Sequence, residues 1–418
     1  MNKQAYKIHI IGGGVSGLIA AQVLEENGYT STIIEATDRV GGRVKTDMVD
    51  NYPLDHGFQV LLTAYPSARK YLDFTALDLQ YFLPGAAIFK NKKQVVIGDP
   101  LRNISLLFPT ILSGIGNFSD KVKILQLNAK LKTKSISNIF LSKEQTTLSY
   151  LKDKGFSSGI INDFFIPFFS GIFLEKELQT SSRMFEFVYK MFGEGFASVP
   201  KTGMEAIPKQ LKQKLSTTNF EFNAKVKEVK EQEIILEDGT IRKSDFTIVA
   251  TAPNTLLQTH TKKPVSWKSC TTLYFETEER TISKNMIGLI SDSGTLVNTI
   301  VYVNPSSKIS SGKELLSVTV VDNQGIVGDK LVQKVTQELA TYCSLKQLKF
   351  VKQYEIPRAL PHLPTVAYEK EVKKVKFSER LFLAGDTMLN GSLNAAMISG
   401  ETAAHGVIQT IEALQLTN

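Results

Sequence analysis

The first thirty-five residues carry the pattern that most limits how this chain can fold. An apolar run at 8–11 is typical of a buried parallel strand. Helical periodicity follows until Gly28, which suits the end of a helix. A second run, 31–34, is again apolar and β-branched, and a glycine-rich stretch separates the first run from the helix. This order predicts a β-α-β unit whose first turn reads Gly12-x-Gly14-x-x-Gly17.

Each position of this turn has a physical reason to bind a dinucleotide. Gly12 permits the tight turn, Gly14 lets the backbone approach a pyrophosphate, and Gly17 lets helix and strand pack closely. The first helical N–H groups, those of Val15 and Ser16, would face the phosphates together with the positive end of the helix dipole. We therefore predict a dinucleotide site; the alternative is a glycine-rich turn in an unrelated α/β protein.

The segment after the second strand favours FAD over NAD. Glu35 follows Gly17, the last glycine of the motif, by eighteen residues, close to the spacing of the acid that binds ribose hydroxyls. The stretch from Glu35 and Ala36 to Gly42 and Arg43 resembles the ExxxxxGGR segment of the amine oxidase, phytoene desaturase and protoporphyrinogen oxidase superfamily. The resemblance implies FAD, with Arg43 as a fork-shaped donor to phosphate or flavin oxygens. The alternative makes Arg43 an ordinary surface arginine.

The sequence Asp-His-Gly-Phe-Gln at 55–59 resembles the D-x-G segment that passes beside the isoalloxazine ring in this superfamily. The resemblance implies that the backbone at Gly57 approaches the flavin, and that Phe58 and Gln59 form part of the cofactor wall. His56 is the candidate catalytic residue of the segment, and a satisfied structural histidine is the alternative.

Two later segments resemble the same superfamily. Residues 200–204 resemble its P-x-G-G-M element, although Thr202 replaces the first glycine, and the backbone at Val226 would then flank the adenine. Residues 380–405 resemble the C-terminal signature that places an aspartate, here Asp386, beside the ribityl chain or the pyrophosphate. A helix beginning near Asn394 would direct its N–H groups at the flavin and stabilise the reduced form. The signature implies three further cofactor contacts, at Gly385, Ser392 and Ala395.

Composition excludes several other classes of protein. The net charge is +8, and no nucleic-acid-binding motif accompanies it. The two cysteines, Cys270 and Cys343, cannot form a disulfide framework or a CxxC site, which favours a reducing compartment. The five histidines lack metal-ligand spacing, so no metal is expected. Relatives with covalent FAD attach it through a later cysteine, and none follows Cys343, so the resemblance implies noncovalent FAD.

No export signal and no membrane-spanning run is visible, which predicts a cytoplasmic protein. The segment 104–134 nevertheless combines an apolar stretch with five lysines. This combination suits peripheral contact with a membrane. The alternative is an ordinary helical part of a substrate domain with a solvated basic face.

Residues 161–204 are unusually rich in phenylalanine. These rings either fill a core or line a cavity for an apolar substrate. The nine rings are those of Phe164, Phe165, Phe168, Phe169, Phe173, Phe185, Phe187, Phe192 and Phe196.

The expected fold is α/β: a Rossmann-like FAD-binding domain from residues 1–83, 200–255 and 365–418, with an inserted α+β substrate domain from 84–199 and 256–364. A helix is expected at 66–82 and a hairpin at 86–97. Before the chain returns to the FAD domain, candidate polar groups of the cavity are Tyr354, Arg358 and His362, with exposed loop residues as the alternative.

The function that follows is an FAD-dependent oxidoreductase resembling phytoene desaturases. It would pass a hydride from an apolar, isoprenoid or carotenoid-like substrate to flavin N5. Amine oxidation, protoporphyrinogen-type oxidation and a flavin-binding subunit without turnover are the alternatives. The electron acceptor stays open among oxygen, a quinone and others.

Overall fold

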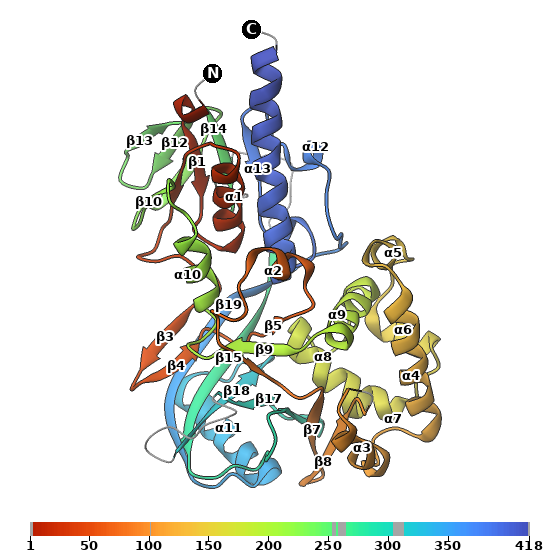
Figure 1. Cartoon of the computed structure of the whole chain (residues 1–418). Helices are drawn as coiled ribbons and strands as arrows, with labels where there is room; N and C mark the ends of the chain where they lie inside the picture. Colours follow the sequence, from red (N-terminus) through yellow and green to blue (C-terminus); the bar gives the residue numbers. More distant parts are fainter. Residues whose placement is uncertain (1–2, 101, 253–255, 258–264, 304–312, 417–418) are drawn as a thin grey trace.

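The computed structural model of the chain describes residues 3–100, 102–252, 256–257, 265–303 and 313–416. Two large sheets organise it (Figure 1): a five-stranded parallel sheet near both chain ends, and a seven-stranded sheet of mostly antiparallel strands. Among the described residues, no helix has both the length and the apolar character needed to cross a bilayer.

The parallel sheet has the strand order β10-β2-β1-β14-β20 and is the predicted Rossmann-like unit. Its central strands are fully buried, as expected for apolar strands covered on both faces. Two packed helices, α1 and α13, cover one face, and a small antiparallel sheet contributes apolar side chains to the other. The bounds are β1 (Ile8–Ile11), α1 (Val15–Glu26), β2 (Ser31–Ile34), β10 (Asn219–Glu221), β11 (Val226–Val229), β12 (Glu233–Leu236), β13 (Ile241–Lys243), β14 (Phe246–Val249), β20 (Leu381–Leu383) and α13 (Leu393–Leu416).

The seven-stranded sheet has the order β19-β15-β18-β17-β16-β7-β8. Two long strands, β15 and β19, pair antiparallel and run from this sheet towards the parallel one (Figure 1). The helix α11 packs its apolar side against the sheet. The bounds are β7 (Gly85–Lys90), β8 (Lys93–Gly98), β15 (Ser266–Thr277), β16 (Ile287–Ile290), β17 (Val297–Tyr302), β18 (Glu314–Val320), α11 (Gly328–Cys343) and β19 (Leu348–His362).

A helical layer, residues 104–194, packs beside this second sheet. The phenylalanines of 161–204 mainly fill its core, because five of them are buried. Four of these rings contact one another, and the fifth, Phe187, packs against Tyr65 and Phe140. The ring of Phe196 is exposed. The bounds are η2 (Ile104–Leu106), α3 (Leu107–Leu112), α4 (Phe118–Thr133), α5 (Ile136–Leu141), α6 (Thr147–Asp153), α7 (Ser158–Ile160), the π-helical η3 (Ile161–Phe165), α8 (Ile166–Phe173) and α9 (Ser182–Glu194).

Short elements join these layers. They are η1 (Lys3–Ala5), β3 (Thr46–Val49), β4 (Tyr52–Asp55), β5 (Leu61–Leu62), α2 (Pro66–Tyr71), β6 (Leu79–Tyr81), β9 (Ala197–Pro200), α10 (Ala206–Gln213), α12 (Val372–Val375) and η5 (Asp386–Met388).

One local prediction, and one alternative, were wrong. The helix expected at 66–82 ends at Tyr71, since the chain turns to pair β6 with β9. Residues 353–362 are not a loop but the end of β19, because pairing with β15 supplies their backbone hydrogen bonds. The expected hairpin at 86–97 is confirmed as β7 and β8. The predicted domain bounds stay predictions, and the one at 255 lies outside the described residues.

Candidate functional site

The glycine-rich loop lies where the carboxyl ends of β1 and β2 meet the start of α1, the usual position of a nucleotide in this topology. Gly12 has a positive φ of 107°, which favours glycine. A Cβ at Gly17 would lie 2.1 Å from the carbonyl oxygen of Gly12, so only glycine lets this turn close. Gly14 is the N-cap of α1 and offers no capping side chain, so the first N–H groups of Val15 and Ser16 point out of the helix start.

Glu35 stands at the end of β2, buried beside this loop. Its Oε2 accepts a hydrogen bond from the N–H of Gly13 at 2.7 Å, which fixes the carboxylate against the loop. Ala36 follows on the exposed side. The N–H of Ala224 bonds to the carbonyl of Glu35 at 3.0 Å, and this brings Val226 to the same end of the parallel sheet.

Gly41 and Gly42 bring the backbone against the loop. Gly41 donates to the carbonyl of Gly13 at 2.9 Å, and both glycines have positive φ. Arg43 follows, and its guanidinium forms an ion pair with the carboxylate of Asp386. The structure thus brings together two predicted residues that are more than three hundred positions apart in the sequence. Arg43 is not an isolated surface arginine.

The side chain of Arg43 makes two further contacts. It lies over the ring of Trp267, 5.1 Å from the ring centroid, and donates to the carbonyl of Ala359 at 3.1 Å. Both residues belong to the long strands of the second sheet. The guanidinium therefore joins the two sheets at the candidate site.

The C-terminal signature forms a loop and a helix start beside Arg43. Gly385 has a φ of 129°, and Asp386 is buried. Ser392 precedes α13, and its Oγ accepts from the N–H of Ala395 at 3.0 Å. Asn394 is fully buried, and its Oδ1 accepts from the backbone N–H of Ser67 at 3.0 Å. The start of α13 is therefore held in a fixed orientation.

The start of α13 also lies against the start of α1. Ser16 donates through Oγ to the carbonyl of Ala396 at 2.8 Å. A Cβ at Gly400 would lie 2.2 Å from the carbonyl oxygen of Ser16, so the two helix backbones touch. Two helix N-termini thus open on the same site.

The segment 56–59 connects this site to the second sheet. Gly57 has a φ of 95°, and a Cβ there would face Ile356 of β19. Gln59 donates to the carbonyl of Arg43 at 3.1 Å. Phe58 packs edge-on against the ring of Phe82, 6.2 Å between centroids.

His56 belongs to a polar network beside the site. Its Nε2 lies 2.9 Å from Asp47 Oδ2, and its ring stacks on Tyr354 at 4.4 Å. Burial alone would raise the pKa of Asp47. Hydrogen bonds from His56, Arg39 and Tyr354 outweigh burial and lower that pKa to about 2. The catalytic role of His56 stays a prediction, and these contacts favour a role in holding the β3–β4 hairpin.

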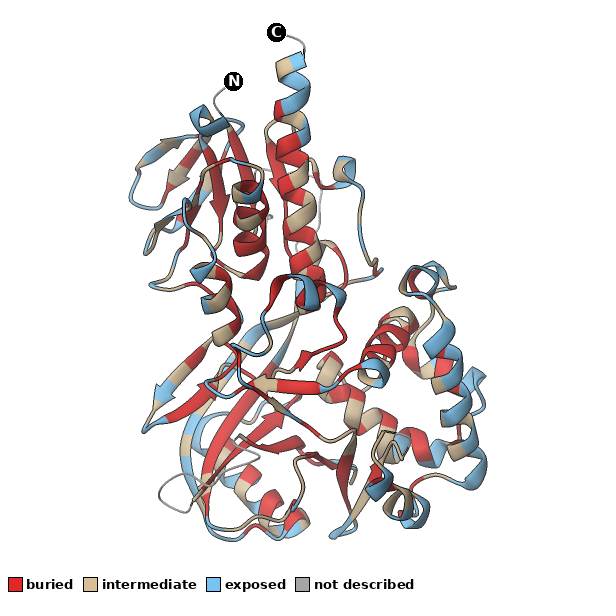
Figure 2. Cartoon of the chain, in the orientation of Figure 1, coloured by how far each residue is buried: buried red, intermediate tan, exposed pale blue. Residues whose placement is uncertain are grey.

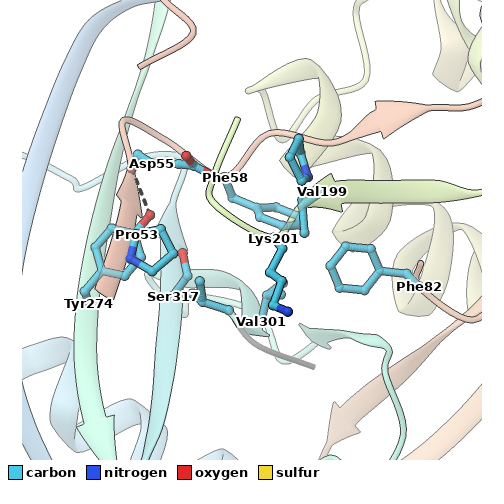
Figure 3. Close-up of a pocket in the computed structure, with 12 residues that line it drawn as sticks. Pro53, Asp55, Phe58, Phe82, Val199, Lys201, Tyr274, Val301 and Ser317 are labelled. Atoms are coloured by element: carbon cyan, nitrogen blue, oxygen red, sulfur yellow. Dashed lines mark hydrogen bonds between the residues drawn. The ribbon is translucent and has the colours of Figure 1, made fainter. Parts of the chain in front are cut away.

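A small cavity lies between segment 53–58 and the face of the seven-stranded sheet (Figure 3). Its volume is about 30 Å³, room for about one water molecule, so a substrate binds here only if lining side chains move. The lining is mostly apolar, with four polar side chains. The lining residues are Pro53, Asp55, Phe58, Phe82, Val199, Pro200, Lys201, Gly203, Tyr274, Val301, Val303 and Ser317.

Asp55 is the acid of this cavity. Its Oδ1 accepts from Thr46 Oγ1 at 2.5 Å and from the N–H of Met204 at 2.9 Å. Its Oδ2 accepts no hydrogen bond from a described residue. Burial outweighs these bonds and raises the pKa of Asp55 to about 6, with a contribution from the charge of Glu205. Tyr274 lies next to it and donates to the carbonyl of Asp55 at 2.8 Å (Figure 3).

Comparison with known proteins decides the family. The family model described as flavin-containing amine oxidoreductase matches residues 15–408, nearly the whole chain. The chain belongs to the flavin-containing amine oxidoreductase family. This membership confirms the predicted superfamily and the predicted class, a flavoprotein oxidoreductase.

Individual relatives of the family are distant. Protoporphyrinogen oxidase 2 of Arabidopsis thaliana is 25% identical over 170 residues, which are 40% of this chain and 32% of that protein. Cyclohexylamine oxidase from Brevibacterium oxydans IH-35A has a TM-score of 0.71 at 12% identity, covering 97% of this chain and 99% of that one. A putrescine oxidase solved with putrescine has a TM-score of 0.68 at 14% identity, with the same coverage. At such identities the solved structures confirm the α/β fold class alone.

The residues present fit the cofactor of this family. The uncapped start of α1 and the cation Arg43 lie together, as a pyrophosphate requires. The backbone of Gly42 approaches Gly14 closely, and a side chain at position 42 would crowd this approach, because a Cβ there would lie 3.3 Å from Gly14 Cα. Both cysteines are unpaired and buried.

Other sequence candidates lie elsewhere, and one residue was missed. Arg358 and His362 are exposed on β19 and do not line the cavity. Asp55 was not predicted as a functional residue, although it starts the Asp-His-Gly motif. The motif itself was the available signal. The raised pKa of Asp55 depends mainly on its burial in the folded chain, with a smaller contribution from the charge of Glu205, which lies far away in the sequence.

Proposed function

We propose that the protein binds FAD noncovalently between the glycine loop, Arg43 and the start of α13, and oxidises an apolar substrate. Bound FAD supplies a hydride acceptor at its N5 atom. The chain's own residues position that cofactor: two helix starts face its charged groups, and Glu35 stands where a ribose is held.

The observation that supports this proposal best is the position of the cavity. Phe58 lies in the segment predicted to form the flavin wall, and the same side chain lines the cavity. Most of the other lining side chains are apolar. A desaturase or dehydrogenase reaction on an isoprenoid or carotenoid-like substrate suits such a lining.

Asp55 supplies the proton chemistry in this proposal. When a carbon–carbon bond is desaturated, one hydrogen leaves as hydride and the other as a proton. With a pKa of about 6, Asp55 is mainly a carboxylate at neutral pH, and its Oδ2 is free to take that proton. Thr46 and Met204 hold Oδ1 and fix the orientation of the group.

Amine oxidation is the second candidate, and Asp55 again favours it. A carboxylate in a mostly apolar cavity can pair with the ammonium group of an amine substrate. Two solved amine oxidases also share the fold, although at 12% and 14% identity. A flavin-binding subunit without turnover is distinguished from both by measuring turnover.

Gly14→Val tests cofactor binding. Gly14 has a φ of −74°, and a Cβ there would meet only Gly42 Cα, at 4.0 Å, so the protein itself tolerates a side chain. The side chain would instead occupy the space of the pyrophosphate. We expect the purified wild type to show flavin absorbance and the variant to fold equally well without it. A variant that keeps full flavin content would contradict this cofactor position.

Anaerobic reduction of the bound flavin tests the substrate class. Carotenoid-like polyenes, protoporphyrinogen, putrescine and cyclohexylamine are each mixed with the protein, and flavin bleaching is followed. Bleaching by the carotenoid-like polyenes supports the first candidate, and bleaching by the amines alone supports the second. Bleaching by protoporphyrinogen alone would instead favour protoporphyrinogen-type oxidation. Reoxidation with oxygen or a quinone then identifies the acceptor. A metabolite comparison of cells carrying wild type and Gly14→Val extends the search to compounds outside this panel.

A further inference from the structure

An apolar surface stands out on the helical layer, far in the sequence from the candidate site. Five large apolar side chains of η2, α3 and the start of α4 are between 54 and 82% exposed. We call these five residues the apolar tip: Ile104, Phe108, Ile111, Leu112 and Phe118.

The backbone that carries the apolar tip is well anchored. Lys121 of α4 donates to the carbonyl of Ile111 at 2.9 Å, which holds α4 against the end of α3. Leu106 and Ile115 point inwards and are buried. Asp120 closes a capping box with Asn117 at the start of α4. The exposed side chains are therefore presented by a fixed backbone and continue along α4 as a narrow stripe, Val122 and Leu125.

Positive charge follows this surface along α4. Residues 104–134 contain five lysines and one acid, Asp120. Lys134 forms an ion pair with Glu186, so the other four lysines supply the positive charge of this segment. Asp120 is fully buried and bonds to Ser157, so it offers no exposed negative charge. Lys130 and Lys132 are exposed on α4, whose outer side is drawn largely as exposed at the right of Figure 2.

We infer that the apolar tip inserts into the surface of a lipid bilayer containing anionic lipids. Exposed aromatic and aliphatic side chains beside lysines suit the boundary between acyl chains and anionic headgroups. The helix α4 alone is only weakly amphipathic, since its lysines occupy more than one face. The tip formed by α3 and the first turns of α4 therefore carries the insertion, and the lysines add attraction to the headgroups.

The charge pattern favours a bilayer over a second copy of the chain. A two-fold interface would bring the same patch together twice and set lysines against lysines, with no exposed acid of 104–134 to pair with them. Anionic headgroups complement the same lysines. The inference does not depend on the proposed function, so the two can fail separately.

Vesicle co-sedimentation tests it with the whole protein. Wild type is mixed with vesicles of phosphatidylcholine alone, or of phosphatidylcholine with phosphatidylserine, at low and high salt. We expect binding to the mixed vesicles that weakens as salt screens the lysines. The double variant Phe108→Ser/Phe118→Ser should lose roughly tenfold or more in affinity. Ile241→Ser, which removes an exposed apolar side chain on β13, is the matched control and should bind as wild type.

The lysines are tested by Lys130→Gln/Lys132→Gln. Each lysine near an anionic surface contributes roughly fivefold in affinity, so this variant should bind at least roughly tenfold more weakly. Lys227→Gln/Lys230→Gln removes two exposed lysines beside the parallel sheet and is the control. Sedimentation velocity of each protein checks its fold and its oligomeric state.

Three outcomes would overturn the inference. One is wild type that stays in the supernatant with phosphatidylserine vesicles at low salt. Another is variants of the tip that bind as tightly as wild type. The third is wild type that dimerises in solution and loses only dimerisation in Phe108→Ser/Phe118→Ser, which would assign the surface to a second copy.

Discussion

Asp55→Asn should stabilise the protein above pH 6, against the usual effect of altering a buried polar residue. The substitution keeps an oxygen at Oδ1 for the bonds from Thr46 and Met204. It removes a charge that the fold disfavours, since folding raises the pKa of Asp55 from 3.8 to about 6. Two pKa units correspond to about 3 kcal/mol, which is the largest gain expected for the variant.

The sign of the pH dependence follows from proton binding. Between the two pKa values the folded state holds a proton on Asp55 that the unfolded state has released. The stabilising contribution of protonated Asp55 is therefore complete below the ordinary pKa and is lost as pH rises through about 6. The asparagine variant has no such loss. The gain in unfolding free energy of Asp55→Asn over wild type should be small near about pH 4 and reach its maximum above about pH 7.

Urea unfolding of both proteins across this pH range, each saturated with FAD, measures the difference. Asp47→Asn is the opposite control, because the pKa of Asp47 is lowered and its charge stabilises the fold above the ordinary pKa. That variant should be destabilised at neutral pH and approach wild type only in strong acid. A stability difference between Asp55→Asn and wild type that does not change with pH would refute the burial argument. In turnover, Asp55→Asn should remove the limb of the pH–rate profile near pH 6, if Asp55 is the proton acceptor.

The packing and the ion pair predict the effects of three further substitutions, the first of which has Gly193→Ala as its control. Gly400→Ala should lower stability by about 1–3 kcal/mol or more in thermal unfolding, because its Cβ would meet the Ser16 carbonyl at 2.2 Å; Gly193→Ala on α9, where no atom lies within 4 Å, should be neutral or slightly stabilising. Phe185→Ala should lower the free energy of unfolding in urea by about 3–5 kcal/mol, since this ring is fully buried among other rings. A variant that keeps most of its stability but loses activity would support the alternative that these rings line a cavity. Arg43→Gln should weaken FAD binding roughly tenfold or more in equilibrium dialysis by removing a charged donor, and unchanged affinity would place the pyrophosphate elsewhere.

The cofactor half of the fold was predictable because short stretches of sequence encode it. The turn at Gly12, the close approach at Gly17 and the short path from Glu35 to Arg43 are local consequences of glycine geometry and strand pattern. The pairing of Arg43 with Asp386 then follows from the parallel sheet, which brings the ends of β1, β14 and β20 to one edge.

Predictions failed where long-range contacts outweighed local pattern. Residues 66–82 do have helical periodicity, but the helix ends at Tyr71 because the residues of β6 pair with β9 instead. The phenylalanines of 161–204 were open between core and cavity, because ring content does not reveal whether neighbours fill the space between the rings. The structure shows Phe185 in contact with Phe165 and Phe169, so these rings pack against one another and fill the core.

The difference between local sequence patterns and long-range contacts also explains why the substrate is harder to infer than the cofactor. The cavity is assembled from side chains as distant as Asp55, Phe82, Val199 and Ser317, and no periodic pattern connects them. Its one acid, Asp55, acquires a raised pKa only when the folded chain buries it. A substitution at a lining position outside the cofactor motifs, such as Phe82 or Ser317, can therefore change the cavity while every cofactor motif stays intact. Distant relatives of one fold can accordingly include both a protoporphyrinogen oxidase and amine oxidases.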